Sequence, residues 1–447
     1  MAGTMVPRIR TDIGRLGLGG LTWVDFAAGV AEAVSSAIPF DAYCLHTVDP
    51  GTIMFTGSVN RDVGCSGSWL AHHEYVVEDV NKWSFLAHSG RIAGATSIDT
   101  HGQLSRSTRF RSQAAYGFGD ELRVSLVVDG IYWGAAAFLR HTGRPWFTEA
   151  DVKALIVLTP AIAAGLRRSM LAPVVSARPV SPVDYGPGVV VFDGNGKLDS
   201  ISDAAARWIG VMIEDPPPDH PSESRMVQAI AARARSIPPG TDPLELAARA
   251  RVRTRNGIWL LMYGTRLSGD DSGRTAVIIH PAAPQDVAPV IALSYGLTAR
   301  ECQVAMHCIQ GHATRGIARA LAMSPHTVQD HLKSIFDKTG VRSRGELVGQ
   351  IFLDHYATRW ETPALTAHPA SSCSASTHRR HPTKLLHRLL RVRRAERTRR
   401  PARYVSALTR RWPDPPPVGR SPGHQWAILL TIGGQVCWPR WAESPGR

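Results

Sequence analysis

The sequence lacks any apolar run of the roughly 18 to 20 residues that a membrane-spanning helix needs. Its first twenty residues contain neither a continuous apolar core nor a small-residue cleavage site, so we do not expect a signal peptide. Only six cysteines occur in 447 residues, without the spacing of a disulfide framework, which favours reduced thiols. These absences predict a cytoplasmic protein with no membrane partner.

Motifs of catalysis and metal binding are missing as well. We find no nucleophile–base motif, no zinc signature and no paired carboxylates. His72, His73 and Glu74 stand together without a second cluster at ligand spacing, so a packed or solvated group is the better interpretation. We therefore expect no enzyme, no metal and no cofactor. A nucleotide-signalling phosphodiesterase within residues 20–170 is the enzymatic alternative.

Excess acidic charge is absent, and the positive excess is confined to one end. The net charge is +14, yet 16 of the 51 lysines and arginines and only 3 of the 37 acidic residues follow Ala364. Basic and acidic residues are nearly balanced before that point. The charge therefore says nothing about nucleic-acid binding by the folded part.

Residues 21–170 carry the pattern of an α+β region, after a glycine- and arginine-containing segment, 1–20, that we expect to be flexible. Thr22 and Thr148 are suited to cap an early and a late helix. Two strand pairs stand between them, and Asp129-Gly130 is a strong hairpin signal. The pattern resembles a GAF domain, through LRVSLVVDGIYWGAAAFLRHTGRPWFTEADV at 122–152. The resemblance implies a sensor, with an unidentified small-molecule ligand as a candidate partner.

Residues 171–186 contain several prolines and predict a linker. Beyond it, two short strands flank the turn Gly194-Asn195-Gly196, and Asp203 is placed to cap a helix. Three further strands are expected at 248–256, 258–267 and 274–280. This order resembles a PAS-like domain over 187–283. We expect residues 215–245 to be a partly disordered insertion.

Residues 290–360 predict four short helices with clear start and end signals. Thr298 and Glu301 form a capping box, and Gly311 stands where a left-handed residue ends the first helix. Thr314 is predicted to cap the second helix. Ser324-Pro325 begins the third, with Val328, Leu332 and Ile335 on its inner face, Gly340 at its end and Ser343 before the fourth. Helix, tight turn, helix is the geometry that places a helix in the DNA major groove.

The same segment resembles the LuxR-type (LuxR/NarL/FixJ) DNA-binding domain, through LTARECQVAMHCIQGHATRGIARALAMSPHTVQDHLKSIFDKTGVRSRGELV at 297–348. The resemblance implies that the third helix enters the major groove and that the fourth makes a dimer contact. The positions carried over as facing the groove are Gln329, Asp330 and Lys333. Those carried over as phosphate contacts are Thr314, Thr327, Lys338 and Arg342.

Two positions depart from that family. Gly316 replaces a usual acidic residue, and Gln329 replaces a usual lysine, while Asp330 adds a negative charge. Gly316 should weaken the second helix by roughly 1 kcal/mol relative to alanine. These departures motivate an alternative function: a ligand-binding or interaction protein whose helix-turn-helix no longer binds DNA.

Residues 366–447 are basic and rich in proline and serine, and we expect them to be disordered. A basic amphipathic helix near Leu385 and a frame-shifted end are the alternatives. The predicted fold is thus a multidomain α+β chain with GAF-like and PAS-like sensors, an all-α four-helix helix-turn-helix domain and this tail. The predicted function is transcription regulation through double-stranded DNA, as a homodimer, with RNA polymerase as a further candidate partner.

Overall fold

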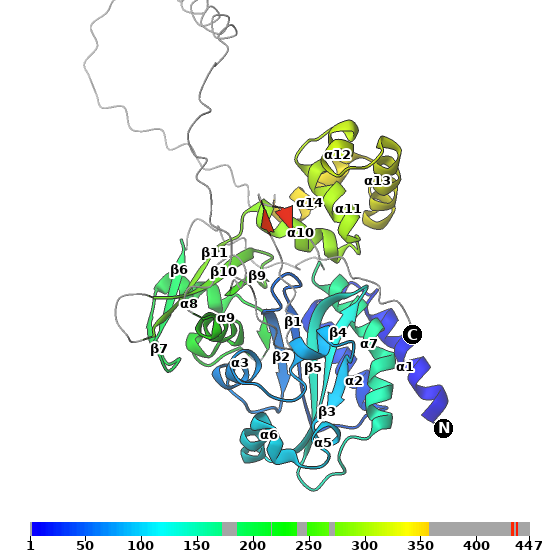
Figure 1. Cartoon of the computed structure of the whole chain (residues 1–447). Coiled ribbons are helices and arrows are strands. Elements are labelled where there is room, and N and C mark those ends of the chain that lie inside the picture. The colour runs from blue at the N-terminus through cyan, green and yellow to red at the C-terminus, as the bar shows by residue number, and fades with distance from the viewer. Residues whose placement is uncertain are drawn as a thin grey trace, which may run out of the picture. The chain divides into compact units, whose positions relative to one another are not determined.

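The computed structural model describes residues 2–171, 186–215, 217–238, 248–267 and 273–356, together with 431–432 and 435–436. Residues 1–361 form one compact unit and residues 362–447 a second. The first unit contains two α/β regions followed by a helical region (Figure 1). Among the described helices, none is both long and apolar enough to cross a membrane.

The first α/β region is built on an antiparallel sheet in the order β3-β4-β5-β1-β2, to which β8 of the second region adds in parallel. The predicted hairpin is confirmed, and Asp129 and Gly130 both have positive φ at its turn. The elements are α1 (Ala2–Leu16), α2 (Trp23–Ser35), β1 (Ala42–Val48), β2 (Phe55–Arg61), α3 (Gly67–Tyr75), α4 (Trp83–His88), β3 (Ala93–Ala95), α5 (Thr96–Asp99), α6 (Thr108–Gln113), β4 (Phe118–Val128), β5 (Ile131–His141) and α7 (Glu149–Ser169).

Helices α1, α2 and α7 cover one face of this sheet (Figure 1). Two predicted caps are confirmed: Thr22 accepts a hydrogen bond from the Asp25 N–H, and Thr148 forms a capping box with Asp151. Each satisfies backbone donors that a helix start leaves free. These two helices are therefore fixed by signals that lie within a few residues of their ends.

The prediction that residues 1–20 are flexible is wrong. Helix α1 occupies most of this segment, and Ile9 and Ile13 are buried against α7. A Cβ on Gly17 would lie 2.7 Å from the Gly165 Cα, so glycines allow the two segments to approach closely. The apolar spacing of Val6, Ile9 and Ile13 is helical, but Pro7 and the glycines at the end obscured it.

The second α/β region is a five-stranded sheet in the order β7-β6-β11-β10-β9, with antiparallel neighbours. The predicted strands are present within a few residues of their expected bounds. The elements are β6 (Gly188–Phe192), β7 (Leu198–Ile201), α8 (Asp203–Gly210), β8 (Glu214–Asp215), α9 (Arg225–Ser236), β9 (Ala248–Arg253), β10 (Trp259–Arg266) and β11 (Thr275–Pro281).

Two details of this region differ from expectation. Ser202, not Asp203, caps α8, because its hydroxyl accepts from the Ala205 N–H. The segment expected to be a partly disordered insertion contains α9, which packs between α3 and both sheets. Its sequence RMVQAIAARARS is buried nearly all round, because small alanines let it fit between close neighbours. The sequence is nevertheless amphipathic, with Met226, Val227 and Ile230 on one side, but the prolines at 216–218 and 238–239 obscured this signal.

The helical region comprises α10 (Pro284–Ser294), α11 (Ala299–Ile309), α12 (Thr314–Ala320), α13 (Pro325–Thr339) and α14 (Arg344–Tyr356). Helix α10 was not predicted. Its buried side chains join those of β10 and of α11–α14 in one apolar cluster. The second sheet and the four predicted helices therefore share a core through α10.

Several predictions concern residues outside this description. Most of the predicted linker, at 172–185, is not described. In the second unit only two short paired strands, Thr431–Ile432 and Gln435–Val436, are described. The predicted disorder of 366–447 therefore stays a prediction.

Candidate nucleic-acid interface

The ends of α11 and α13 follow the sequence signals. Thr298 and Glu301 form the predicted capping box of α11, and Gly311 has φ +81° after its last turn. The Ser324 hydroxyl accepts from the Thr327 N–H at 3.0 Å, with Pro325 at the first helical position. Gly340 ends α13 with φ +75°. The two ends of α13 are therefore set by local chemistry that the sequence contains.

Helix α13 separates an apolar face from a polar one. Val328, Leu332 and Ile335 are buried among the neighbouring helices. Gln329, Asp330 and Lys333, the three predicted groove-facing residues, are exposed. The helix is anchored on one side and presents hydrogen-bonding side chains on the other, which is the requirement for reading base edges in a major groove.

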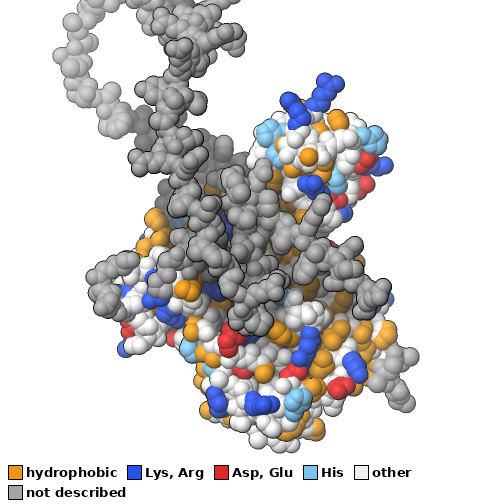
Figure 2. Space-filling view, viewed as in Figure 1, with side chains coloured by type: hydrophobic (Ala, Val, Ile, Leu, Met, Phe, Trp, Pro, Cys, Tyr) orange, Lys and Arg blue, Asp and Glu red, His pale blue; other side chains and the backbone are white. Residues whose placement is uncertain are grey.

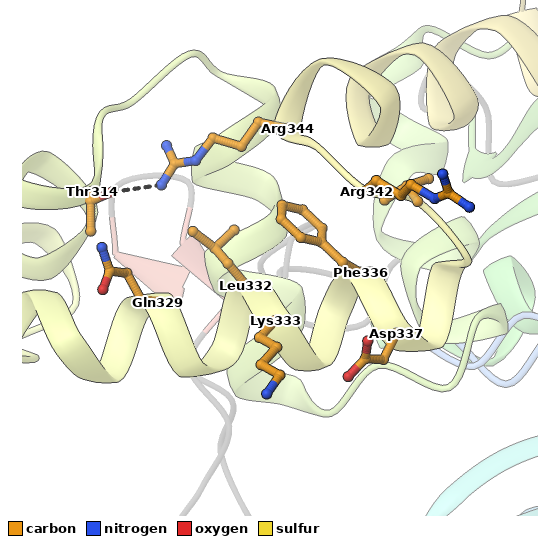
Figure 3. A pocket seen from close by; sticks show the side chains of 9 residues that line it. Thr314, Gln329, Leu332, Lys333, Phe336, Asp337, Arg342 and Arg344 are labelled. Carbon is orange, nitrogen blue, oxygen red and sulfur yellow. Dashed lines mark hydrogen bonds between the residues drawn. The ribbon is translucent and has the colours of Figure 1, made fainter.

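An open groove of about 470 Å³ runs along α13 beside the starts of α12 and α14 (Figure 3). Leu332 and Phe336 lie on the side of α13 that faces Arg344, whereas Lys333 and Asp337 point to the opposite side (Figure 3). Its lining residues are Thr314, Gln329, Leu332, Lys333, Phe336, Asp337, Val341, Arg342 and Arg344. The groove thus has a partly apolar floor and the cations Arg342 and Arg344 on its rim, while Lys333 and the anionic Asp337 lie on the other side of α13.

Thr314 does not cap α12, contrary to the prediction. Ala313 occupies the cap position without a side-chain hydrogen bond, and Thr314 is the first residue of the helix. Its hydroxyl instead accepts a hydrogen bond from Arg344 Nη2 at 2.8 Å. The difference arises because a guanidinium from α14 lies close enough to engage the hydroxyl.

Arg344 is the residue that the sequence reasoning missed. Its Nη1 donates to the His312 carbonyl at 3.0 Å, so one guanidinium ties the start of α14 to the α11–α12 turn and to Thr314. A cation in the first turn of a helix opposes the helix dipole. That unfavourable placement was the signal in the sequence, because it indicates a role outside the residue's own helix.

The structure places some of the predicted DNA-contact residues in the groove and others outside it. Thr314 and Arg342 line the groove with Gln329 and Lys333, so four of the seven predicted residues share one surface. Thr327 and Lys338 do not line it. The Thr327 and Ser324 hydroxyls are 2.9 Å apart, and Lys338 Nζ donates to Glu301 at 2.7 Å.

Asp330 stands outside the groove lining and pairs with His326, whose Nδ1 is 2.9 Å from its carboxylate. Both side chains are largely exposed. When His326 is protonated, the pair is an ion pair that offsets the negative charge of Asp330.

Glu301 joins α11 to α13 through a buried carboxylate. It accepts hydrogen bonds from the Thr298 N–H, from the Ser334 hydroxyl at 2.6 Å and from Lys338. Burial alone would raise the pKa of this carboxyl, but these hydrogen bonds outweigh it and lower the pKa to about 2. The carboxylate is therefore ionised at neutral pH and holds α13 against α11.

Charges of both signs are mixed on the visible face of the helical region, with histidines among them (Figure 2). Over residues 297–360 basic residues only slightly outnumber acidic ones. Such a surface supplies only modest electrostatic attraction to phosphate groups.

A second cluster of charges is buried in the first α/β region. Arg109 Nε donates to Glu121 at 2.6 Å, and Arg123 bridges Glu121 and Glu74 while lying over the Trp83 ring. Burial raises the pKa of Glu74, whereas at Glu121 the two arginines outweigh burial and lower the pKa to about 2. The sequence did not predict this cluster, because Glu74 lies on α3, Arg109 on α6, and Glu121 and Arg123 on β4.

Two cysteines and two tryptophans of the first α/β region lie in its core. Cys44 and Cys65 are buried, and burial raises their pKa to about 12 and about 11, which leaves no reactive thiolate. Trp83 and Trp133 are fully buried. Among the described residues, no group of three or more histidine, cysteine or acidic side chains is placed to hold a metal.

Comparison with known proteins identifies the helical region. Residues 296–350 match the family model for bacterial regulatory proteins of the luxR family. This confirms the resemblance noted from the sequence: the segment is a LuxR-type helix-turn-helix, a domain of DNA-binding transcription regulators. No curated protein sequence matches the chain.

Two solved structures show only remote likeness. The crystal structure of the phage VqmA–DPO complex has 17% identity and a TM-score of 0.19, covering 42% of this chain and 90% of that chain. The crystal structure of the E. coli DhaR(N)–DhaL complex has 14% identity and a TM-score of 0.19, covering 63% of this chain and 90% of that chain. Scores this low support no conclusion about the first two regions.

Proposed function

We propose that this protein is a sequence-specific transcription regulator that binds double-stranded DNA through α13, as a homodimer. The observation that carries the proposal is the exposure of Gln329, Asp330 and Lys333 on a helix whose opposite face is buried. The luxR family match over 296–350 supports it.

In this proposal α13 lies in the major groove. Gln329 can bond an adenine bidentately, Lys333 can reach a guanine or a phosphate, and Asp330 can accept from a cytosine. Arg342 and Arg344, on the rim of the groove beside α13, supply phosphate contacts next to the base-reading residues. Two half-sites read by two copies would compensate for the modest charge of each domain.

The two α/β regions act as sensors in this proposal, the first GAF-like and the second PAS-like. Their antiparallel sheets with flanking helices support this assignment. The cluster of buried charges around Arg109 and Arg123 is a candidate binding site for an unidentified small molecule. The protein would work as a binding protein and not as an enzyme, in the cytoplasm where bacterial DNA lies, with RNA polymerase as a candidate partner.

The test is selection of sites from a random duplex library by the full-length protein, followed by binding measurements across a salt series. Lys333→Ala should weaken binding and reduce the slope of log K against log salt by about 1 if Lys333 contacts a phosphate. If it contacts a guanine instead, the selected sequence should relax at one position. Lys153→Ala, an exposed lysine of α7, is the matched control and should change neither. Absence of any selected sequence would favour the alternative, a helix-turn-helix that no longer binds DNA.

A further inference from the structure

Strand β9 carries a row of arginines on one face. In ARARVR, residues 248–253, Ala250 and Val252 point to the apolar core and are fully buried. Arg249, Arg251 and Arg253 therefore share the opposite face, because side chains alternate along a strand. The same register places Arg251 beside Leu261 and Arg253 beside Trp259, the two β10 residues on which α10 packs.

Arg251 connects three parts of the chain. Its Nε and Nη2 donate to the two carboxylate oxygens of Asp49 at 2.8 and 2.6 Å, and its backbone N–H donates to the same group at 3.0 Å. Asp49 lies in the β1–β2 turn of the first α/β region. The remaining Nη1 donates to the carbonyl of Asp286, in the first turn of α10, at 3.3 Å.

This ion pair is almost completely withdrawn from solvent, with exposed side-chain fractions of 9% for Arg251 and 0% for Asp49. The turn is shaped around it, because a Cβ on Gly51 would lie 2.6 Å from Arg251 Nη2. A buried bidentate pair is geometrically exacting, and removing one partner leaves the other charge uncompensated. The intact pair therefore fixes the β1–β2 turn to β9, and the Nη1 hydrogen bond of Arg251 extends this connection to the first turn of α10.

Helix α10 in turn is part of the DNA-binding domain's core. Val287 and Ile291 belong to the same apolar cluster as Trp259 of β10 and as Val304 and Leu347 of α11 and α14. Only residues 295–298 separate α10 from α11. A displacement of the first turn of α10 is thus carried directly into the helix-turn-helix.

We propose that Arg251 is a positioning residue that links the first α/β region to the LuxR-type domain, so that a change at the β1–β2 turn alters the placement of α10 and with it DNA binding. The coupling to DNA rests on the proposed function. The mechanical link between Asp49 and α10 does not, and can be measured without DNA.

The experiment is hydrogen–deuterium exchange on the full-length protein, wild type against Asp49→Asn and Arg251→Met. Asp49→Asn is the informative variant, because it keeps the side-chain volume and lies in a different region from α10. We expect amide exchange over Val287–Ile291 to rise at least about tenfold in both variants, since breaking a buried pair is strongly destabilising. Gly51→Ala keeps both partners but displaces the guanidinium, and should have a smaller effect of the same kind.

The matched control is Arg61→Met. Arg61 pairs with Asp215 at 2.6 Å, also between the first and second regions, but it is partly exposed and has no hydrogen bond to α10 among those described. It should raise exchange near β2 and β8 and leave α10 unchanged. If Asp49→Asn leaves α10 unchanged, or if Arg61→Met raises α10 exchange equally, the inference is wrong.

DNA binding is the second readout on the same variants. Titration of each variant with excess DNA measures the fraction of protein that is competent to bind. The dissociation constant can then be determined for that fraction alone. We expect Asp49→Asn and Arg251→Met to change the dissociation constant severalfold while Arg61→Met does not. If α10 exchange responds but the dissociation constant does not, the link exists without regulating DNA binding. If wild type selects no DNA, the proposed function fails while the exchange result still decides the link.

Discussion

Glu301 makes the polar contacts that join α11 to α13, so Glu301→Gln is the sharpest perturbation of the candidate interface. Glutamine keeps the size of the side chain and can still accept from the Thr298 N–H, but it cannot hold the charge that Lys338 Nζ meets at 2.7 Å. The side chain of Glu301 is only 6% exposed, so solvent screens this charge little. We expect the helix-turn-helix to lose stability without changing its fold.

The pKa of Glu301 sets the magnitude. Its lowering from 4.5 to about 2 corresponds to about 3 kcal/mol of stabilisation by the ionised form. Because the folded-state value is depressed, this stability is fully present above pH 4.5 and is lost as the pH falls towards 2. Glu301→Gln should therefore cost about 3 kcal/mol at pH 7, and the gap between variant and wild type should close in acid.

Amide exchange at Leu332 and Ile335, the buried positions of α13, measures this free energy in the full-length chain. Glu346→Gln is the control: its carboxylate also caps a helix, through the Arg342 N–H, but it is exposed. It should cost less than about 1 kcal/mol. Equal effects of the two variants, or a gap that does not vary between pH 3 and pH 7, would refute the reasoning.

Three further changes test separate features. Gly340→Ala places a side chain at φ +75° and should destabilise α13 by about 1 kcal/mol, measurable by amide exchange at its last turn. Gly67→Ala would overlap the Glu223 carbonyl, so it should force α3 and the start of α9 apart and lower the melting temperature of the chain. Asp330→Asn removes an exposed negative charge from α13 and should strengthen DNA binding about fivefold in low salt, with Asp12→Asn of α1 as an unaffected control.

The helix-turn-helix could be predicted closely because its signals are local. Ser324-Pro325 and Gly340 mark the two ends of α13 and lie directly at those ends. The spacing of the apolar residues of α13 predicts which face is buried. The exposed residues then follow by subtraction. Thr314 was misassigned as a cap because its partner, Arg344, lies 30 residues away.

Helices α9 and α10 were not predicted, for a different reason. Helix α9 has an apolar side formed by Met226, Val227 and Ile230, but the prolines on both sides of it, at 216–218 and 238–239, indicated an irregular insertion. Helix α10 begins with Pro284 and contains Pro289, which resembles a connecting loop, and only its packing on Trp259 and on α11 makes it part of a core. In both, the helix is stabilised by partners that the local sequence does not name.

The arginines of β9 define the limit of this reasoning most clearly. The alternation in ARARVR predicts a strand and divides its residues between two faces, but it does not say which face is buried. Read alone, three arginines on one face indicate solvent. Arg251 is nevertheless buried, because Asp49, 202 residues earlier, supplies both carboxylate oxygens. A buried arginine costs more than it contributes unless a partner is fixed in place beforehand, so its burial implies that the β1–β2 turn and β9 are held in register by the rest of the fold. That dependence is what makes the pair sensitive to a change in either region, and it exists only at the level of the assembled sheets.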